Sequence, residues 1–326
     1  MKSVLFAVMF APVLILGATR QSVTPAAEIR NAYITARLLL PDTAQGYYRG
    51  TRFDWSGQIA HLKAGAHTYF GQWFDRYDPV LHDAIMGPVE EFGPLGYDAA
   101  KPGETFVKIG VGALVKPDTQ EHNRFGYYTI ANHGTWKVRT TRDRVHFVHQ
   151  LDAGGYAYEY AKVVRLVPGK PELEVSHILK NTGPQRIRTN VYSHNFLVID
   201  EKTTGKDVTV VFPYPVSAAA GRGFGDVVSA TKNEIVFHRD LESGDAVFSP
   251  DITGFGPTVK DFDIRVENRV TGAGVRLTGD QPLARVVFWA AHKAISPETY
   301  VDIDVASGEE FRWVFRYGFY STARRR

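Results

Sequence analysis

The sequence predicts an all-β protein built as one large sandwich of antiparallel sheets. Runs in which apolar and polar residues alternate recur along the chain, and turn-forming pairs such as Pro168-Gly169 and Ser307-Gly308 separate them. No segment of about 15 residues carries an apolar stripe at helical spacing, so the strand–helix alternation of a parallel fold is missing. The alternating runs are Glu28–Leu39, Trp136–Val138, Val145–Gln150, Ala157–Leu166, Leu173–Leu179, Arg186–Val191, Val208–Phe212, Asp263–Val270, Ala284–Trp289, Tyr300–Val305 and Glu310–Tyr317.

Two stretches allow more specific predictions than the general alternation of apolar and polar residues. Between Leu151 and Val191, consecutive strands joined by tight turns predict a meander. The segment Gly87–Gly112 instead mixes Gly and Pro with acidic and aromatic residues, which indicates a long ordered loop. Such loops often bind ligands, and a plain connector is the alternative.

The N-terminus has the pattern of a signal peptide over residues 1–18. Lys2 precedes the apolar stretch Val4–Leu16, and the small residues Gly17 and Ala18 follow. The apolar core is shorter than the roughly 20 residues of a membrane-spanning helix, so export is favoured over a membrane anchor. We expect a periplasmic or secreted protein in which residues 19–326 form a single domain, because no linker-like segment divides them.

Composition excludes several classes of function. The chain has no cysteine, which rules out disulfides and thiol chemistry, and 38 basic against 35 acidic residues leave no surplus typical of a nucleic-acid surface. No HExxH pair and no Gly-x-Ser-x-Gly motif occurs, so we predict no metal, no cofactor and no serine triad. The 16 tyrosines and 5 tryptophans suit a β core and could also stack on sugar rings.

His194 is the first candidate for catalysis. It follows an alternating strand in "TNVYSHNFLVID", between Tyr192 and Asn195, and an imidazole can give or take a proton near neutral pH. A histidine with a purely structural role is the alternative.

A second group of candidates lies upstream of this strand. In "GYYRGTRFDWSG", Arg49 and Arg52 could hold a carboxylate or sugar hydroxyls through forked hydrogen bonds, and Trp55 could stack on a pyranose. Surface ion pairs, loop braces or core packing are the alternatives for the whole group. The remaining predicted substrate-binding residues are His82, Glu91, Lys108, Tyr158, Tyr192, Asn195 and Trp289.

Two segments of the C-terminal half resemble aldose 1-epimerases (galactose mutarotases). Over Leu173–Asp200, two strands joined by an Asn-Thr-Gly turn lead to "YSHNFLVID", as they do around the catalytic histidine of that family. Over Val286–Phe319, "VVFWAAHKAISPETYVDIDVASGEEFRWVFRYGF" is similar to the family's ending, in which a short loop carries a glutamate before two final strands.

The resemblance implies a galactose mutarotase-like sandwich with Glu298 as base and His194 as acid. The carboxylate would remove the proton of the anomeric hydroxyl while the imidazolium protonates the ring oxygen, so that the ring opens and recloses. We then expect the two side chains to face each other across a cleft, several Å apart, with room for a sugar ring between them. A turn-capping role is the alternative for Glu298, and His82 is the best candidate for a second site histidine.

Three functions fit these observations. The first is aldose 1-epimerase-like interconversion of anomers of a mono- or oligosaccharide. The second is a lyase or hydrolase of an acidic, uronate-containing glycan on the same fold, in which Arg49, Arg52 and Lys108 neutralise the uronate. The third is carbohydrate binding without catalysis. None involves nucleic acid or a membrane once the signal peptide is removed, and the oligomeric state is left open.

Overall fold

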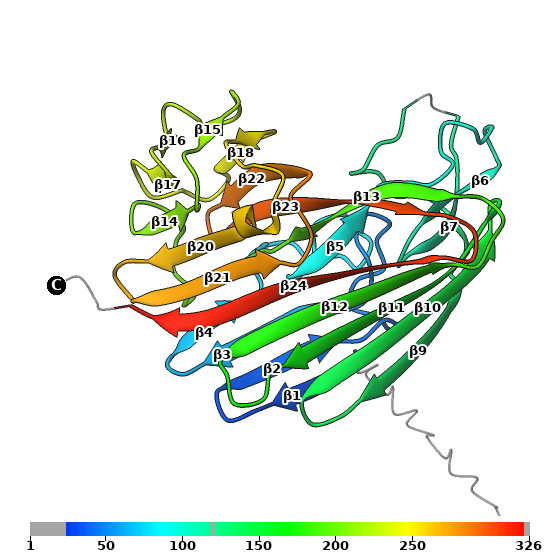
Figure 1. The fold of residues 1–326 in the computed structure, drawn as a ribbon, viewed down its shortest axis with the longest axis horizontal. Helices are drawn as coiled ribbons and strands as arrows, with labels where there is room; N and C mark the ends of the chain where they lie inside the picture. The colour runs from blue at the N-terminus through cyan, green and yellow to red at the C-terminus, as the bar shows by residue number, and fades with distance from the viewer. Residues whose placement is uncertain (1–23, 119–120, 323–326) are drawn as a thin grey trace, which may run out of the picture.

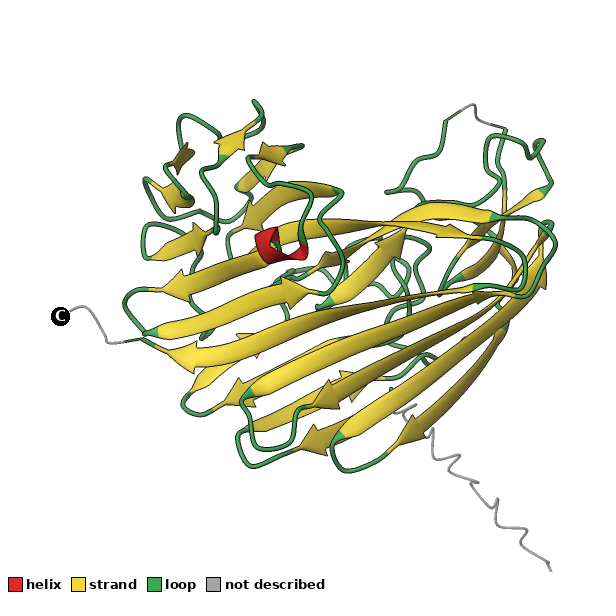
Figure 2. Ribbon diagram, viewed as in Figure 1, coloured by secondary structure: helices red, strands yellow, loops and turns green. Residues whose placement is uncertain are grey.

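The computed structural model describes residues 24–118 and 121–322, in which almost every regular element is a β-strand (Figures 1 and 2). The only helix in these ranges is the 3-10 turn η1 (Val259–Asp261). Paired strands run antiparallel throughout the sheets, which confirms the predicted fold class. The predicted signal peptide lies outside the described residues. No helix in the described ranges is long and apolar enough to cross a membrane.

Ten strands form the largest sheet. Along its central strands buried and partly exposed residues alternate regularly, as in β12, where Leu173, Val175 and Leu179 point inward. In spatial order the strands are β16 (Val228–Thr231), β17 (Glu234–Phe237), β14 (Val208–Val211), β20 (Asp263–Asn268), β21 (Ala273–Gly279), β24 (Glu310–Ser321), β12 (Glu172–Asn181), β11 (Tyr156–Leu166), β10 (Arg144–Ala153) and β9 (Thr135–Thr140).

Four smaller sheets complete the architecture. A five-stranded sheet has the order β18 (Ala246–Ser249), β22 (Arg285–Ala291), β23 (Ala294–Val305), β13 (Ile187–His194) and β5 (Val89–Phe92). A four-stranded sheet contains β1 (Ala26–Arg30), β2 (Ile34–Leu39), β3 (Ile59–Ala64) and β4 (His67–Phe70). The remaining two sheets contain β6 (Thr105–Lys108), β7 (Gly112–Val115) and β8 (Ile130–Asn132), and β15 (Ser217–Ala218) with β19 (Ile252–Thr253).

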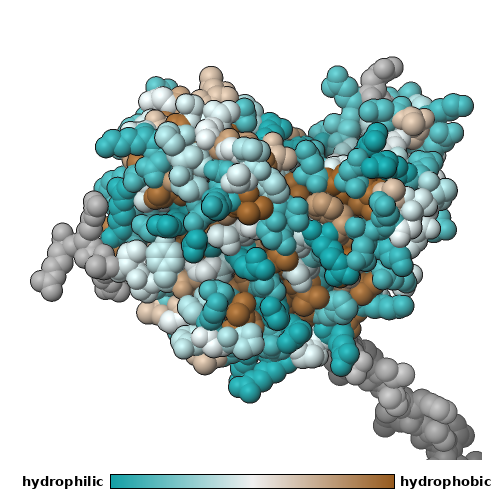
Figure 3. All heavy atoms as spheres, in the orientation of Figure 1, coloured by the Kyte–Doolittle hydropathy of each residue, from teal (hydrophilic) through white to brown (hydrophobic). Residues whose placement is uncertain are grey.

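The main hydrophobic core lies between the ten-stranded sheet and both the four- and the five-stranded sheets. Ring centroids of Tyr69 on β4 and Phe319 on β24 are 4.5 Å apart, and those of Phe92 on β5 and Tyr160 on β11 are 5.3 Å apart. The same inner face of the large sheet therefore contacts both smaller sheets. Polar side chains are frequent on its other face (Figure 3).

The five-stranded sheet is buried on both faces. Every residue from Ala294 to Val301 on β23 is buried, without the alternation of a half-exposed strand. Its inner face joins the main core, whereas Tyr192 and Val287 on its outer face belong to a second apolar cluster with Phe53 and Trp55 of an N-terminal loop. In Figure 3 the outline of the molecule is indented above β13 and β23 as placed in Figure 1. This outer face is where the candidate site lies.

Three local predictions need correction. The run Glu28–Leu39 is two strands, because the side chain of Asn31 accepts hydrogen bonds from the N–H groups of Tyr33 and Ile34 and closes a turn. The meander covers only β10 to β12, since β13 crosses to the five-stranded sheet. The segment Gly87–Gly112 is not one long loop, because it contains β5 and β6.

Candidate active site

His194 and Glu298 meet on the outer face of the five-stranded sheet. The register pairs Tyr192 on β13 with Tyr300 on β23, which brings the residues two positions further, His194 and Glu298, onto the same face. Nε2 of His194 lies 3.1 Å from Oε1 of Glu298. Glu298 is thus part of a strand, not of the short loop implied by the resemblance, and it does not cap a turn.

Aromatic rings fix the imidazole of His194. The ring of Phe196 stacks on it with centroids 3.6 Å apart, and Phe53 and Trp289 pack edge-on at 5.7 Å and 5.1 Å. Phe196 has a φ of 42°, a left-handed conformation unusual for an aromatic residue, so the fold holds this ring in place at some conformational cost. Nδ1 of His194 has no hydrogen-bond partner among the described residues. Trp289, a predicted substrate-binding residue, thus lies beside the histidine.

Burial shifts the pKa values of His194 and Glu298 in opposite directions. The exposed fractions of the two side chains are 3% and 5%. Burial raises the pKa of Glu298 to about 8, although Arg52 and Arg124 oppose the shift. Burial also holds the pKa of His194 well below its usual range, and Arg52 adds to that effect. Near neutral pH the pair therefore shares one proton and carries no net charge.

The contact between the two side chains differs from the expected geometry. We expected a gap of several Å that holds a sugar ring, but at 3.1 Å no ring fits between them. The direct contact suits the reaction, because the anomeric hydroxyl and the ring oxygen are bonded to the same carbon. An acid and a base that serve these two atoms can therefore lie side by side.

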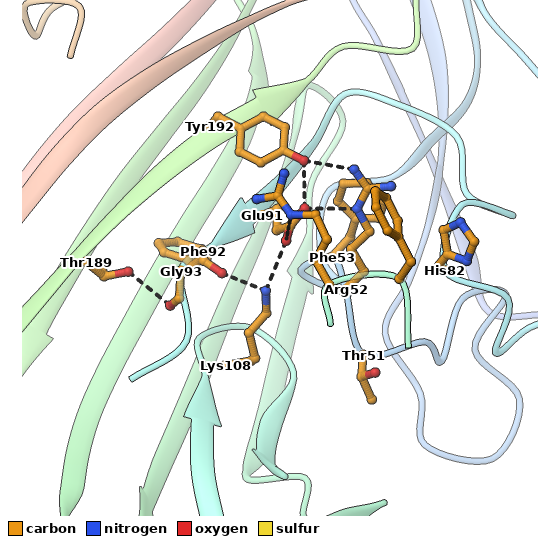
Figure 4. Close-up of polar contacts among 12 residues, drawn as sticks. Thr51, Arg52, Phe53, His82, Glu91, Phe92, Gly93, Lys108, Thr189 and Tyr192 are labelled. Carbon is orange, nitrogen blue, oxygen red and sulfur yellow. Dashed lines mark hydrogen bonds and ion pairs between the residues drawn. The ribbon is translucent and has the colours of Figure 1, made fainter. Parts of the chain in front are cut away.

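Beside this pair, Glu91 on β5 organises a cluster of buried polar groups (Figure 4). Its carboxylate accepts a hydrogen bond from Nε of Arg52 at 2.9 Å and one from the Tyr192 hydroxyl at 2.6 Å. Nζ of Lys108 lies 3.4 Å from Glu91 and donates to the carbonyl of Phe92 at 2.6 Å. Arg52 also donates to the Tyr192 hydroxyl at 3.1 Å. These four residues were all predicted to belong to the site.

The charges of this cluster fix the protonation state of Glu91. Burial alone would raise its pKa, but Lys108, Arg52 and Arg124 together hold it well below its usual range. Burial lowers the pKa of Lys108 to about 8, against the effect of Glu91. Glu91 is thus a permanent anion and a structural partner of the cations, whereas Glu298 is the carboxyl group that can exchange a proton.

Sequence reasoning missed Arg124 and Tyr300. Nε of Arg124 lies 3.4 Å from Glu91, and its guanidinium carbon lies 5.7 Å from the ring centroid of Tyr192. Tyr300 stacks on Tyr192 with centroids 4.5 Å apart. Tyr300 had a usable signal, because it is two residues from Glu298 on one strand and so shares its face. Arg124 had none, because it lies in a loop.

Three predicted residues lie inside the protein and serve its packing. Trp55 is fully buried and its indole donates to the carbonyl of Gly50 at 2.8 Å, a position that does not support stacking on a sugar. Tyr158 is on the ten-stranded sheet, where its hydroxyl contacts Nδ1 of His149 at 3.0 Å, so its predicted role in the site is wrong. Asn195 bonds to Pro297 and Tyr317, which anchors the chain directly after His194.

Two others lie at the edge of the site. The guanidinium of Arg49 donates to the carbonyl of Ala44 at 3.0 Å, within its own loop, so Arg49 braces that loop. His82 packs edge-on against Phe125, which in turn covers the guanidinium of Arg52 at 5.0 Å. Figure 4 shows His82 apart from the groups that surround Glu91. This position does not support the predicted role of His82 as a second site histidine.

A second buried cluster lies behind β5, in the main core. Lys162 on β11 forms an ion pair with Glu90, and another with Asp54 at 2.6 Å. Asp54 accepts a hydrogen bond from the Tyr160 hydroxyl at 3.2 Å, and Nε2 of His177 is 3.6 Å from Glu90. Gly110 has a φ of 77°, and a Cβ there would lie 2.5 Å from Asp54, so only glycine fits. The cluster ties the loop that carries Arg52 to both layers of the sandwich.

Neither cluster has the make-up of a metal centre. No group of three or more His, Asp or Glu side chains in the described ranges is arranged to hold a metal ion. Lysine and arginine, which bind anions and not metals, dominate around Glu91. Proton transfer and anion binding are the chemistry that these residues can supply.

Comparison with known proteins identifies the fold. No protein-family model and no curated protein sequence matches the chain. Among solved structures, a galactose mutarotase related enzyme from Lactobacillus acidophilus is similar, with a TM-score of 0.53, 14% identity, and coverage of 92% of this chain and 98% of that one. A galactose mutarotase-like protein from Clostridium acetobutylicum gives 0.55 at 12% identity, covering 92% and 96%. An aldose epimerase homologue from C. elegans gives 0.51 at 15% identity, covering 92% and 100%.

These similarities confirm the galactose mutarotase-like sandwich expected from the C-terminal half. They extend the likeness to nearly the whole chain, including the N-terminal half, for which the sequence offered no match. At such low identity they establish the fold and leave the activity to be argued from the site.

Proposed function

We propose that the protein is an aldose 1-epimerase-like enzyme that interconverts sugar anomers by proton transfer through His194 and Glu298. The observation that carries the proposal is the direct 3.1 Å contact of a carboxyl group and an imidazole on a galactose mutarotase-like fold. Their opposed pKa shifts leave one proton on two groups, and this is the number that a coupled acid and base require.

The proposed reaction begins when that proton lies on His194 and Glu298 is a carboxylate. Arg52 and Arg124 favour the carboxylate form of Glu298, because both lower its pKa, and they also lower the pKa of His194, which makes its imidazolium a stronger acid. The carboxylate accepts the proton of the anomeric hydroxyl, the imidazolium donates its proton to the ring oxygen, and the C1–ring-oxygen bond breaks. The open-chain aldehyde then rotates about the C1–C2 bond. Reversal of both transfers closes the ring to the other anomer and restores the pair.

A lyase acting on an acidic glycan is the second candidate. The cations Arg52, Lys108 and Arg124 around Glu91 favour it, because elimination next to a uronate requires neutralisation of the carboxylate. The Tyr192 hydroxyl is a poor base for that reaction. Burial raises its pKa well above the usual range, and its proton is donated to Glu91. This contrast ranks the lyase below the epimerase.

The test is anomeric exchange measured by NMR on a panel of aldoses and uronates. We expect the wild type to accelerate exchange, and His194→Ala and Glu298→Gln each to lower the catalysed rate by about 10²- to 10⁴-fold, the usual contribution of a general acid or base. His238→Ala, at an exposed position, is the matched control and should retain the wild-type rate.

The alternatives give different readouts in the same samples. An unsaturated uronate absorbance from an acidic polysaccharide would identify a lyase. Binding of sugars without faster exchange would indicate a carbohydrate-binding protein and would refute the epimerase.

A further inference from the structure

We propose that the sugar carries an anionic group, a carboxylate or a phosphate, which Arg52 and Arg124 bind beside the His194–Glu298 pair. This inference rests on the proposed function and names the substrate class of the same site.

The first argument is an imbalance of charge. Arg52, Lys108 and Arg124 all contact the single carboxylate of Glu91. The His194–Glu298 pair beside them is neutral when it holds one proton. Three positive charges thus face one negative charge, and two of the three, Arg52 and Lys108, are buried, where charges are stable only when they are paired. The site is short of anions, and an anionic ligand would supply one.

The second argument is access from solvent. The exposed fractions of the Arg52, Lys108 and Glu91 side chains are 8%, 1% and 3%, but that of Arg124 is 42%. Arg124 thus extends from solvent to the buried carboxylate. A ligand anion that enters from outside meets Arg124 first, and the guanidinium of Arg52 lies on the same carboxylate.

The third argument is the chemistry of the guanidinium group. Arginine offers several N–H donors in one plane, which match the paired oxygens of a carboxylate or phosphate. Arg52 uses Nε on Glu91 and Nη2 on Tyr192, and Arg124 has Nε toward Glu91. Both arginines also act electrostatically on Glu298 and His194. An anion held by them would therefore place the sugar at the proton-transfer pair.

The experiment compares the catalytic efficiency for charged and neutral sugars by NMR anomeric exchange. Galacturonate and glucuronate carry a carboxylate, glucose 6-phosphate carries a phosphate, and galactose and glucose are neutral. We expect kcat/KM of the wild type to be at least about 10-fold higher for one of the charged classes. The carboxylate and phosphate arms show which of the two groups is recognised.

Substitution of Arg124 links that preference to the site. We expect Arg124→Gln to lower the ratio of anionic to neutral kcat/KM by about 10- to 100-fold, mainly through KM, as expected for loss of one charge-assisted hydrogen bond. Arg124→Lys, which keeps the charge and loses the planar donors, should fall in between. Arg37→Gln, at an exposed position on β2, is the matched control and should leave the ratio unchanged.

Two results overturn this inference and leave the proposed function standing. One is equal efficiency on charged and neutral sugars, and the other is an unchanged ratio in Arg124→Gln. If no sugar is exchanged at all, the proposed function fails instead. The inference is then tested by calorimetric binding of galacturonate and glucose 6-phosphate, which Arg124→Gln should weaken by the same factor. Absence of any such weakening would refute it.

Discussion

Glu90 and Glu91 are neighbours on β5, yet they belong to two buried clusters with opposite charge balance. Glu90 points into the main core, where it and Asp54 share the single cation Lys162. Glu91 points to the outer face, where it alone faces Arg52, Lys108 and Arg124. Burial raises the pKa of Glu90 to about 7, although Lys162 opposes the shift, whereas the surrounding cations hold the pKa of Glu91 well below its usual range.

The comparison favours a structural role for the core cluster and supports the proposed role of the outer cluster in binding an anion. On the core side, a proton on Glu90 leaves one cation with one anion, so the cluster can reach neutrality with its own groups. On the outer side the single anion Glu91 faces two arginines that keep their charges throughout the usual pH range, even where Lys108 loses its proton near pH 8. A cluster that needs nothing from outside stabilises the fold, and one that lacks an anion is prepared for a ligand.

The largest expected effect is on stability, from the core side. Lys162→Met leaves Asp54 and Glu90 buried without their cation, and we expect the free energy of unfolding to fall by about 3–5 kcal/mol. Lys108→Met, on the outer side, removes one cation of three and should cost less, about 1–3 kcal/mol for its hydrogen bonds. Urea denaturation of both variants measures the difference. An equal or larger loss in Lys108→Met would contradict the assignment of the two clusters.

The second expected effect is on activity, and here the larger loss should come from the outer cluster and not from the core cluster. Glu91→Gln removes the carboxylate that positions Arg52 and Tyr192, and we expect the anomeric exchange rate to fall about 10- to 100-fold, as for loss of a charged hydrogen bond. Glu90→Gln should stay within about threefold of the wild type, because it resembles the protonated form. Glu91→Asp, which keeps the charge, should recover part of the rate. A loss in Glu90→Gln as large as in Glu91→Gln would show that the clusters do not divide these roles.

Strand β5 also shows why sequence reasoning identified the fold class and missed local elements. Alternation revealed the half-exposed strands of the large sheet, such as β12 and β24. It failed for β5, "VEEF", because both faces of this strand are buried and each carries an acid, so that two adjacent glutamates resemble a polar loop. Pro297 concealed the start of β23 in a similar way, since proline is rare inside sheets.

Sequence reasoning brought candidate residues together where neighbours in the chain stay neighbours in space. Tyr192 and His194 follow directly on the predicted strand Arg186–Val191, and the family resemblance supplied Glu298 as a partner of His194. In the structure β13 continues through both residues and places them on one face. Arg124 could not be placed, because its role depends on how a loop folds back over β13 and β5. Tyr158 was assigned to the wrong side of the sandwich, because periodicity gives the face of a strand but not the layer to which that strand belongs.

The smallest expected effect is the dependence of stability on pH between 6.5 and 8. Over this range the folded protein retains a proton on Glu298, whose pKa is about 8, whereas the unfolded chain, with a pKa of 4.5, has lost it. At Glu298 the folded state then binds more protons than the unfolded state. The contribution of this group to the free energy of unfolding therefore falls as pH rises, by up to about 1.4 kcal/mol per unit, and levels off above pH 8. Glu90, whose pKa is about 7, contributes to the pH dependence in the same direction, and its contribution levels off above about pH 7.

Other groups also contribute at the two ends of this range, so it is the comparison of variants that makes the test specific. Burial lowers the pKa values of His194, His177 and His149, and each adds a rise in stability with pH near 6.5, where the unfolded histidines lose their protons. Lys108, with a pKa of about 8, adds a rise near pH 8.

In urea denaturation at half-unit steps from pH 6.5 to 8, Glu298→Gln should remove a downward contribution to the slope across the range, and Glu90→Gln only from its lower part. Glu242→Gln, at an exposed position, should keep the wild-type slope. If Glu298→Gln kept it as well, Glu298 would already be ionised near neutral pH, and the proton shared with His194, on which the proposed reaction depends, would be absent.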